Sequence, residues 1–198
     1  MMTSEKTSSE QVIYQTLQES IHVKEDLIKQ NIPQIAGVVR LLVNIFESGK
    51  KVILFGNGGS AADAQHIAGE LVNRFNMERP ALPALALTTD TSILTSISND
   101  HNFEQVFSRQ VDAFVQEGDL IVGFSTSGNS KNIINGVIAA RNKGAFTMGF
   151  TGQDGGGLKD LVEMCFCVPS DSTPRIQEAH ITVWHAICEA VEIELFKE

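Results

Sequence analysis

The sequence predicts an α/β fold, a three-layer sandwich in which helices cover both faces of a five-stranded parallel sheet. Two observations predict it: short apolar runs recur along the chain, and stretches with helical periodicity alternate with them. The apolar runs occupy residues 51–55, 85–88, 119–124, 145–151 and 164–168. Strands that alternate with helices pair in parallel, and because both faces of such a sheet are buried, its strands are apolar throughout.

The segment before the first strand is predicted to be a helical hairpin. Residues 11–30 and 32–48 both have helical patterns, and Gly49 follows as a glycine at a helix C-terminus would. Residues 1–8 are rich in polar side chains and are expected to be frayed. A hairpin that extends beyond the sheet must bury its apolar stripe, and packing on another subunit is a natural way to do so.

The remaining helices are predicted after the strands, at residues 61–74, 92–98, 103–115, 131–142 and 176–196. Right-handed crossovers then place the loops that follow the strands along one edge of the sheet, where ligands of such folds bind. We expect residues 1–198 to form one domain, with 1–48 as a helical extension and 49–198 as the α/β core.

Composition limits the classes of partner. The chain has 198 residues, of which 42% are hydrophobic and 20% charged, and a net charge of −9. An acidic surface argues against nucleic-acid binding, although a local group of N–H donors can still hold a small anion. No apolar run reaches the roughly 18–20 residues that span a bilayer, and residues 1–10 lack the apolar core of a signal peptide. We therefore expect a cytoplasmic protein without a membrane partner.

Three cysteines occur in the sequence. Cys165 and Cys167 alternate within an apolar run, so both are expected to point to one face of a strand, and Cys188 lies in a helical stretch. Their spacing differs from that of a metal site. We expect reduced cysteines that pack as small hydrophobic side chains.

Two loops after predicted strands have the composition of anion sites. Residues 56–60 (GNGGS) open a helix, and their glycines allow positive φ and close backbone approach. A turn that only connects strand to helix is equally compatible with this loop. Residues 125–130 (STSGNS) combine four hydroxyl groups, one glycine and a helix N-terminus. Helix capping needs one hydroxyl residue rather than four, so we favour a phosphate site here.

Ionisable residues gather on two of the predicted helices. His66 and Glu70 are four residues apart and therefore share a helix face, although a solvent-exposed pair explains this spacing as well. The last helix carries Gln177 and His185. These two are eight residues apart, about 12 Å of helix rise, so their side chains must lean toward each other to share a metal. A buried histidine in the apolar stripe is the alternative for His185.

Four motifs together resemble one protein family. They are GNGGSAADAQHIAGEL from residue 56, SND at 98–100, STSGNS at 125–130 and RIQEAH at 175–180. In this combination and order they resemble the phosphoheptose isomerases of the sugar isomerase (SIS) fold, a flavodoxin-like arrangement. The resemblance runs from about residue 10 to the end of the chain.

The resemblance implies an activity and its site residues. The reaction would convert sedoheptulose 7-phosphate to D-glycero-D-manno-heptose 7-phosphate through an enediol, the first step toward the ADP-heptose of the lipopolysaccharide core. Glu70 would be the base and His185 the acid. The family forms homotetramers with active sites at subunit interfaces, and several members bind zinc. Matching motif positions would hold one zinc ion per subunit through His66, Glu70, Gln177 and His185. They would hold the sugar phosphate through Asn57, Gly58, Gly59, Glu70, Asn99, Asp100, Ser125, Thr126, Ser127, Ser130 and Gln177, with Arg74 also in reach.

Other functions remain compatible with the same fold. A related branch of non-catalytic SIS proteins binds the bacterial replication initiator, and it resembles this chain in its RIQE motif. That branch lacks an acidic residue at the position of Glu70 and a histidine at that of His185, both of which this chain has. A sensor that binds sugar phosphate without turnover, or an isomerase of a different sugar phosphate, would use the same loops.

Overall fold

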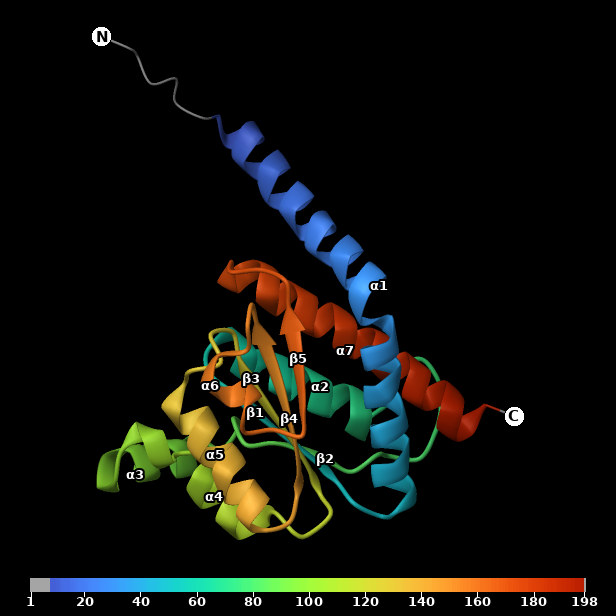
Figure 1. Ribbon diagram of the computed structural model, residues 1–198. Coiled ribbons are helices and arrows are strands. Elements are labelled where there is room, and N and C mark those ends of the chain that lie inside the picture. The colour runs from blue at the N-terminus through green and yellow to red at the C-terminus, as the bar shows by residue number, and fades with distance from the viewer. Residues whose placement is uncertain (1–7, 198) are drawn as a thin grey trace.

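The computed structural model describes residues 8–197, and Figure 1 shows a twisted sheet between two layers of helices. The elements, in chain order, are α1 (Ser9–Glu47), β1 (Val52–Gly56), α2 (Gly59–Val72), β2 (Ala84–Ala86), α3 (Thr91–Asp100), the 3-10 turn η1 (Phe103–Gln105), α4 (Ser108–Phe114), β3 (Leu120–Ser125), α5 (Lys131–Asn142), β4 (Phe146–Gly152), α6 (Gly156–Lys159), β5 (Met164–Val168) and α7 (Thr173–Phe196).

The predicted five-stranded parallel sheet is confirmed. Its strand order is β2-β1-β3-β4-β5, and all four neighbouring pairs are parallel. The chain therefore builds outward from β1 in one direction and from β3 in the other, the flavodoxin-like order. The strand order reverses between β1 and β3, and a crevice at the carboxyl ends of these strands is where ligands bind in such sheets.

Each strand contributes to two separate cores because successive side chains point to opposite faces. Leu54 and Val122 pack with Trp184 under α1, α2 and α7. Ile53 and Phe55 pack on the other face under the helices from α3 to α6. All five residues are fully buried. Burial on both faces explains why the strand sequences are apolar throughout.

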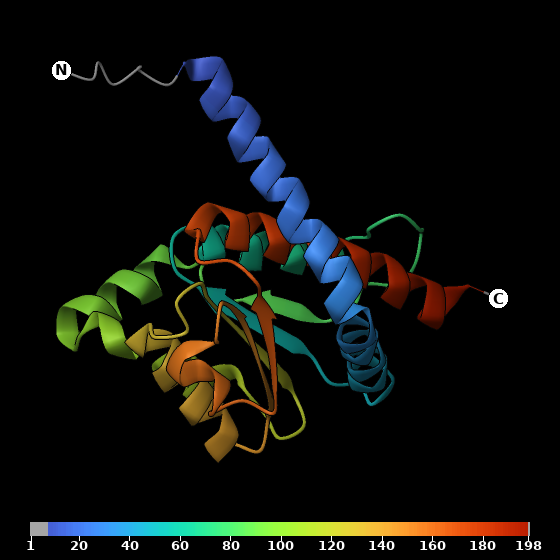
Figure 2. The ribbon, with the colours of Figure 1, turned by 45° about the horizontal axis from the view of Figure 1, so that its top comes forward.

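The predicted N-terminal hairpin is wrong, because α1 is one helix of 39 residues. Pro33 lies inside it, and Figures 1 and 2 show the helix changing direction part of the way along. A proline removes one helical hydrogen bond and kinks a helix without ending it when packing holds both sides. Val38 and Leu42 pack in the core beyond the kink, while Gln34 Nε2 donates to the Cys165 carbonyl at 2.8 Å on the edge strand β5.

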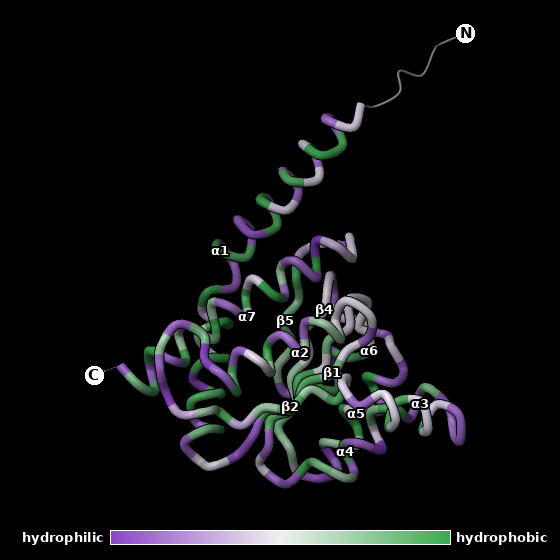
Figure 3. The backbone as a smooth tube through the Cα atoms, turned by 180° about the vertical axis from the view of Figure 1, so that it is seen from behind, coloured by the Kyte–Doolittle hydropathy of each residue, from purple (hydrophilic) through white to green (hydrophobic). Residues whose placement is uncertain are grey.

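The first half of α1 carries an exposed apolar stripe. Figure 3 shows hydrophobic segments repeating along the part of α1 that extends past the sheet. The most exposed of its large apolar side chains are Val12, Ile13, Tyr14, Leu17, Ile21, Ile28 and Ile32, each at least half exposed.

Helix α1 begins at Ser9, directly after the segment expected to be frayed, and Ser8 at the end of that segment is ordered. Ser8 is its N-cap, and its side chain and that of Gln11 form a capping box. The rest of the expected frayed segment, residues 1–7, lies outside the described residues.

Other boundaries differ in smaller ways. The single helix predicted over 103–115 is divided into η1 and α4, and a short helix, α6, forms within the glycine-rich turn after β4. Helix α5 and strand β5 have the predicted bounds. Within residues 8–197, no helix is long and apolar enough to cross a membrane.

Candidate active site

The loop after β1, residues 56–60, is called the glycine loop below. Gly58 has φ of +54° and is the N-cap of α2, a conformation that favours glycine. A Cβ on Gly59 would lie 2.5 Å from Gln177 Nε2, so a side chain here would displace the Gln177 amide. The loop thus brings the start of α2 against the side chain of Gln177 on α7.

The loop after β3, residues 125–130, is called the serine loop. Its hydroxyl groups bond one another: Ser125 Oγ donates to Ser130 Oγ at 3.1 Å. Ser130 is the N-cap of α5, but among the described residues its side chain accepts no hydrogen bond from the helix backbone. Capping therefore does not account for these hydroxyls. Thr126 and Ser127 line an open pocket with Gln153, Asp171, Thr173 and Ile176.

The two loops are joined by a reciprocal amide pair. Asn57 Nδ2 donates to Asn132 Oδ1 at 3.0 Å, and Asn132 Nδ2 donates to Asn57 Oδ1 at 2.8 Å. Asn132 is buried at the start of α5, and its Oδ1 also accepts from the Ile133 N–H at 3.0 Å. The pair fixes the orientation of the Asn57 amide where the strand order reverses. No pattern in the sequence indicated a role for Asn132, although it lies two residues after the end of the serine loop.

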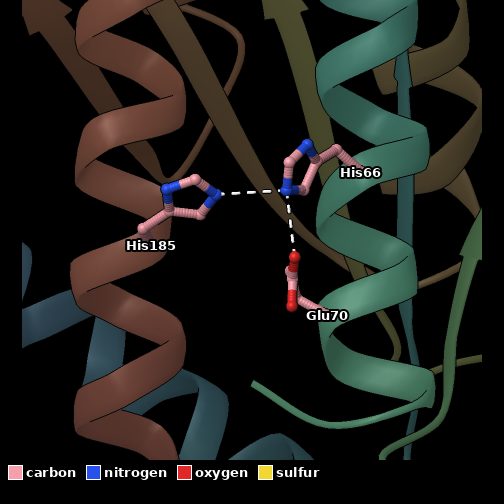
Figure 4. A group of neighbouring side chains, drawn as sticks. All are labelled: His66, Glu70 and His185. Carbon is pink, nitrogen blue, oxygen red and sulfur yellow. Dashed lines mark hydrogen bonds and ion pairs between the residues drawn. The ribbon is translucent and has the colours of Figure 1, made fainter. Parts of the chain in front are cut away.

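Two histidines and a carboxylate meet between α2 and α7 (Figure 4). Glu70 Oε1 lies 2.9 Å from His66 Nε2, as the four-residue spacing predicts. His185 Nε2 approaches from α7 to 3.2 Å from His66 Nε2, although 119 positions separate the two in sequence. The His66 side chain is 49% exposed and that of Glu70 25% exposed, so solvent or a ligand can reach the group.

The donor set of this group suits a metal ion. One ligand atom from each of His66, Glu70 and His185 can be chosen so that all lie within 4.8 Å of one another. Two nitrogens at tetrahedral zinc are separated by about 3.3 Å when each bond is 2.0–2.1 Å long, close to the 3.2 Å between the two imidazoles. Two imidazoles and a carboxylate are also a common zinc ligand set with one position left for another ligand.

The fourth expected ligand, Gln177, lies in the same interface between α2 and α7 but nearer to the start of both helices. Its amide contacts the Cβ position of Gly59, two turns before His66 on α2. α2 and α7 run side by side in the same direction, so Gly59 faces Gln177 and His66 faces His185. The structure therefore brings three of the four expected ligands together and places Gln177 between them and the glycine loop.

A buried ion pair holds the loop after α2 against α7. Glu192 and Arg79 are each only 1% exposed, with Oε1 and Nε 2.9 Å apart. The Glu192 carboxylate accepts three backbone N–H groups, from Phe75, Asn76 and Met77. Burial alone would raise the pKa of Glu192, but these bonds and Arg79 outweigh it and hold the pKa below its usual value.

Arg79 also contacts the backbone of Glu70, one of the candidate metal ligands. Its guanidinium donates to the backbone carbonyls of Glu70 and Leu71, both at 2.8 Å, and so fixes the last turn of α2. The Phe75 ring lies 5.6 Å from the His185 ring, centroid to centroid. The loop therefore fixes the relative positions of Glu70 and His185. No local pattern in the sequence identified this loop.

Asp63 lies one turn before His66 on the same helix. Its Oδ2 is buried and has no hydrogen-bond partner among the described residues. Burial raises the pKa of Asp63 to about 6, although the nearby His66 opposes the shift. Asp63 is therefore a second carboxyl group close to the His66 cluster.

Three expected substrate residues lie apart from this group. Asn99 and Asp100 end α3, and Asn99 Nδ2 donates to Asp100 Oδ1 at 2.8 Å. Among residues 8–197, no hydrogen bond joins them to either loop. Arg74 follows the end of α2, and its Nε lies 2.9 Å from Glu78 Oε1 at the surface.

Comparison with known proteins identifies the family. The model of the SIS domain matches residues 16–152. The phosphoheptose isomerase of Roseiflexus sp. (strain RS-1) is 53% identical over 197 residues, which is 100% of both chains. The structure of a phosphoheptose isomerase from Francisella tularensis superposes with a TM-score of 0.90 at 36% identity, over 93% of this chain and 98% of the other. The structure of the phosphoheptose isomerase from Neisseria gonorrhoeae superposes with a TM-score of 0.89 at 39% identity, over 93% of this chain and 99% of the other.

One relative is identical at about half of its residues over its full length, and solved phosphoheptose isomerases have the same fold. Together these findings assign the family. The chain belongs to the SIS-domain family and, within it, to the phosphoheptose isomerases, which are sugar phosphate isomerase enzymes.

Proposed function

We propose that this enzyme converts sedoheptulose 7-phosphate to D-glycero-D-manno-heptose 7-phosphate, the first step toward the ADP-heptose of the lipopolysaccharide core. The observation that carries the proposal is the meeting of Glu70, His66 and His185 between α2 and α7, since α2 begins at the glycine loop, one of two loops suited to a phosphate. A sugar phosphate isomerase needs acid–base groups and an anion site, and α2 connects the two here, because it begins at the glycine loop and carries His66 and Glu70. The substrate itself is inferred from the family resemblance and the names of the relatives.

The chemistry assigns roles to two of these side chains. Interconversion of a ketose and an aldose moves a proton between C1 and C2 through an enediol, with a base at carbon and an acid at oxygen. Glu70 is the proposed base, and His185 is the proposed acid. His66 is hydrogen-bonded or ion-paired to both and holds them in register.

Zinc is the proposed cofactor, one ion per subunit, held by His66, Glu70, Gln177 and His185. When bound, it would supply a Lewis acid for the sugar oxygens. A carboxylate bound to a metal is a weaker base, so Glu70 does not serve as ligand and base at one instant. The Gln177 amide, next to Gly59, would have to swing toward His185 to complete the set.

The phosphate and sugar are proposed to bind along the edge between the two loops. The start of α5 presents N–H groups toward the serine loop, and the start of α2 does the same at the glycine loop. The proposed contacts to the substrate come from Asn57, Gly58, Gly59, Glu70, Asn99, Asp100, Ser125, Thr126, Ser127, Ser130 and Gln177. Because Asn99 and Asp100 lie at the end of α3, they would contact substrate only in a complete assembly or after α3 moves.

A homotetramer is the proposed assembly, in the cytoplasm, with each chain as a single domain. The exposed apolar stripe on the first half of α1 supports it, because a stripe of this length is rarely left in water. An apolar hollow lined by Leu27, Ile28, Ile32 and Val183 lies where α1 crosses α7 and continues the same surface.

The deciding experiment is an isomerase assay of the purified protein on sedoheptulose 7-phosphate, with added zinc and with a chelator. We expect formation of the heptose 7-phosphate aldose, and loss of rate with chelator that zinc restores. Turnover of other sugar phosphates at a higher kcat/KM would overturn the substrate assignment. A rate that the chelator leaves unchanged would remove zinc from the mechanism.

A further inference from the structure

A pair of thiols lies on β5, which Figure 1 shows at the edge of the sheet. Cys165 Sγ is 3.4 Å from the Cβ site of Gly149, beside Leu158 of the core under α6, whereas the His66 cluster lies between α2 and α7 on the other face. Cys165 Sγ and Cys167 Sγ are 3.7 Å apart, and both residues are partly exposed. They point to the same face, as their alternation in the sequence predicts. The expectation of reduced cysteines that pack as small hydrophobic side chains therefore fits Cys188, which is buried, better than it fits this pair.

The surroundings of Cys167 favour its ionised form. Thr151 Oγ1 lies 3.3 Å from Cys167 Sγ and 3.6 Å from Cys165 Sγ. The hydrogen bond from Cys165, followed by those from Thr151 and the charge of Lys159, lowers the pKa of Cys167 to about 6, against the effects of burial and of Asp154. The same hydrogen bond, together with burial, raises the pKa of Cys165.

These features separate the two thiols by role. A thiolate that is partly exposed and lies next to a second thiol is the arrangement of a peroxide-sensitive cysteine with its resolving partner. Cys188 differs in each respect, because burial raises its pKa to about 12. We infer that Cys165 and Cys167 form an oxidation site, in which a low-molecular-weight hydroperoxide converts the pair to an intrastrand disulfide.

The reaction balances in two steps. The Cys167 thiolate attacks one oxygen of the hydroperoxide, the S–O bond forms, the O–O bond breaks, and the other oxygen leaves as alcohol or water after it takes a proton. Cys165 then attacks the sulfenic sulfur, the S–S bond forms, and the hydroxyl leaves as water with the Cys165 proton. Two thiols are oxidised by two electrons, and the hydroperoxide is reduced by two.

The disulfide requires a change in β5. Residues two apart in a strand have Cα atoms about 6.6 Å apart, near the upper limit for a disulfide, whose sulfur atoms are joined at about 2.05 Å. Because most disulfides have Cα atoms about 5.5–6 Å apart, we expect β5 to pucker as the two sulfur atoms close from 3.7 Å. Cys167 Sγ would then leave its position 3.1 Å from the Cβ site of Gly155, a glycine with φ of +92°.

Gly155 belongs to a turn, residues 152–159, that is tied to the serine loop. The Gly152 N–H donates to the Thr126 carbonyl at 3.0 Å, and the Leu158 N–H donates to the Gly128 carbonyl at 2.9 Å. The Gly157 N–H donates to Asn129 Oδ1 at 3.0 Å. Displacement of this turn would therefore move the serine loop. The resulting effect on KM rests on the phosphate role proposed for that loop, whereas the oxidation itself does not.

The test treats the assembled enzyme with hydrogen peroxide at neutral pH, unfolds it so that the buried Cys188 also reacts, and then counts free thiols with a maleimide. We expect the count to fall from three per chain to one, the mass of the unalkylated protein to fall by two hydrogens, and peptide mapping to place the bond between Cys165 and Cys167. Dithiothreitol should restore all three thiols. Oxygen addition at Cys167 with Cys165 still free would overturn the resolving role, and an unchanged thiol count would overturn the site.

Single variants make the assignment specific. Cys167→Ser should lose no thiols to peroxide on the same time scale, Cys165→Ser should stop at a sulfenic acid, and the matched control Cys188→Ala should still form the disulfide. Oxidised wild-type enzyme should show a higher KM for the sugar phosphate, reversed by dithiothreitol. If the disulfide forms without any change in KM, Cys165 and Cys167 are still an oxidation site, but their oxidation does not affect the serine loop.

Discussion

Asn57 and Asn132 bond each other twice, amide to amide, across the point where the strand order of the sheet reverses. Asn132 Oδ1 also accepts the Ile133 N–H, which excludes a flip of both amides together, so each amide can take only one orientation. The remaining N–H of Asn57 therefore has a fixed direction. This makes Asn132 a positioning residue for a proposed substrate contact.

Replacement of Asn132 by Ala tests that role. The variant leaves the Asn57 amide without its partner, and we expect kcat/KM to fall by about 10- to 100-fold because a contact moves out of its productive geometry. The control is Asn135→Ala on the same helix, whose Nδ2 bonds the Glu104 carbonyl at the surface and should leave kinetics unchanged. Equal kinetics in the two variants would remove the positioning role.

Local patterns were sufficient for much of this fold and for part of the site. The apolar runs predicted the strands because burial on both faces leaves few alternatives, and the His66–Glu70 spacing predicted their contact. The approach of His185 depends on how α2 packs on α7, which no spacing encodes. The hairpin prediction failed at Pro33, where the packing of α1 overrides the local tendency of proline to end a helix.

Replacement of Glu70 by Gln should reduce turnover by about 100-fold or more, since an amide cannot accept the proton that the base removes. The zinc content of the variant should be measured together with its rate. Loss of a metal ligand would lower the zinc content, whereas loss of the base would lower only the rate. A variant that keeps zinc but loses turnover identifies Glu70 as the base. The control Glu189→Gln changes an exposed carboxylate on α7 and should be silent. Normal activity in Glu70→Gln would exclude it from both roles.

Ser127 offers a test of the serine loop. Its hydroxyl accepts from the Asn129 N–H at 3.2 Å and lines the pocket beside Thr126. We expect Ser127→Ala to raise KM by about tenfold, since a hydrogen bond to a charged group contributes about 1.5–3 kcal/mol. The effect on kcat should be smaller, because a contact far from C1 and C2 stabilises substrate and transition state alike. Ser96→Ala, on exposed α3, is the control, and equal KM values would place the phosphate elsewhere.

The buried pair of Glu192 and Arg79 predicts a pH-dependent stability. The folded-state pKa of Glu192 lies below its unfolded value, so its contribution is present above the unfolded pKa and is lost as the pH falls through the folded one. At neutral pH, Glu192→Gln should lower the free energy of unfolding by about 3–5 kcal/mol, because Arg79 is left buried without its charge partner.

Urea unfolding from pH 7 down to pH 3 measures this contribution. The difference between wild type and Glu192→Gln should narrow toward low pH, while the control Glu194→Gln, at an exposed site, should match wild type throughout. A difference that stays constant with pH would show that the Glu192 charge is not what stabilises the loop.

The first half of α1 gives the test of assembly. Deletion of residues 1–30 would also remove Val23 and Leu27, which are buried within the chain, so it would confuse folding with association. Ile13→Glu and Leu17→Glu change only side chains that are 58% and 59% exposed. We expect this double variant to remain folded, with its melting temperature little changed, and to sediment as a species smaller than the wild-type oligomer. Charges on an apolar contact between subunits cannot be buried without partners.

The matched control places the same charges on the polar face of that helix, as Gln15→Glu and Gln18→Glu. It should sediment like wild type, because those side chains are exposed and lie outside the apolar stripe. The assay then links assembly to chemistry. If Asn99 and Asp100 reach substrate only from a neighbouring subunit, the smaller species should lose activity together with its oligomeric state. A monomer with full activity would show instead that each chain holds a complete site, and α3 would have to move within the chain to bring these residues to the substrate.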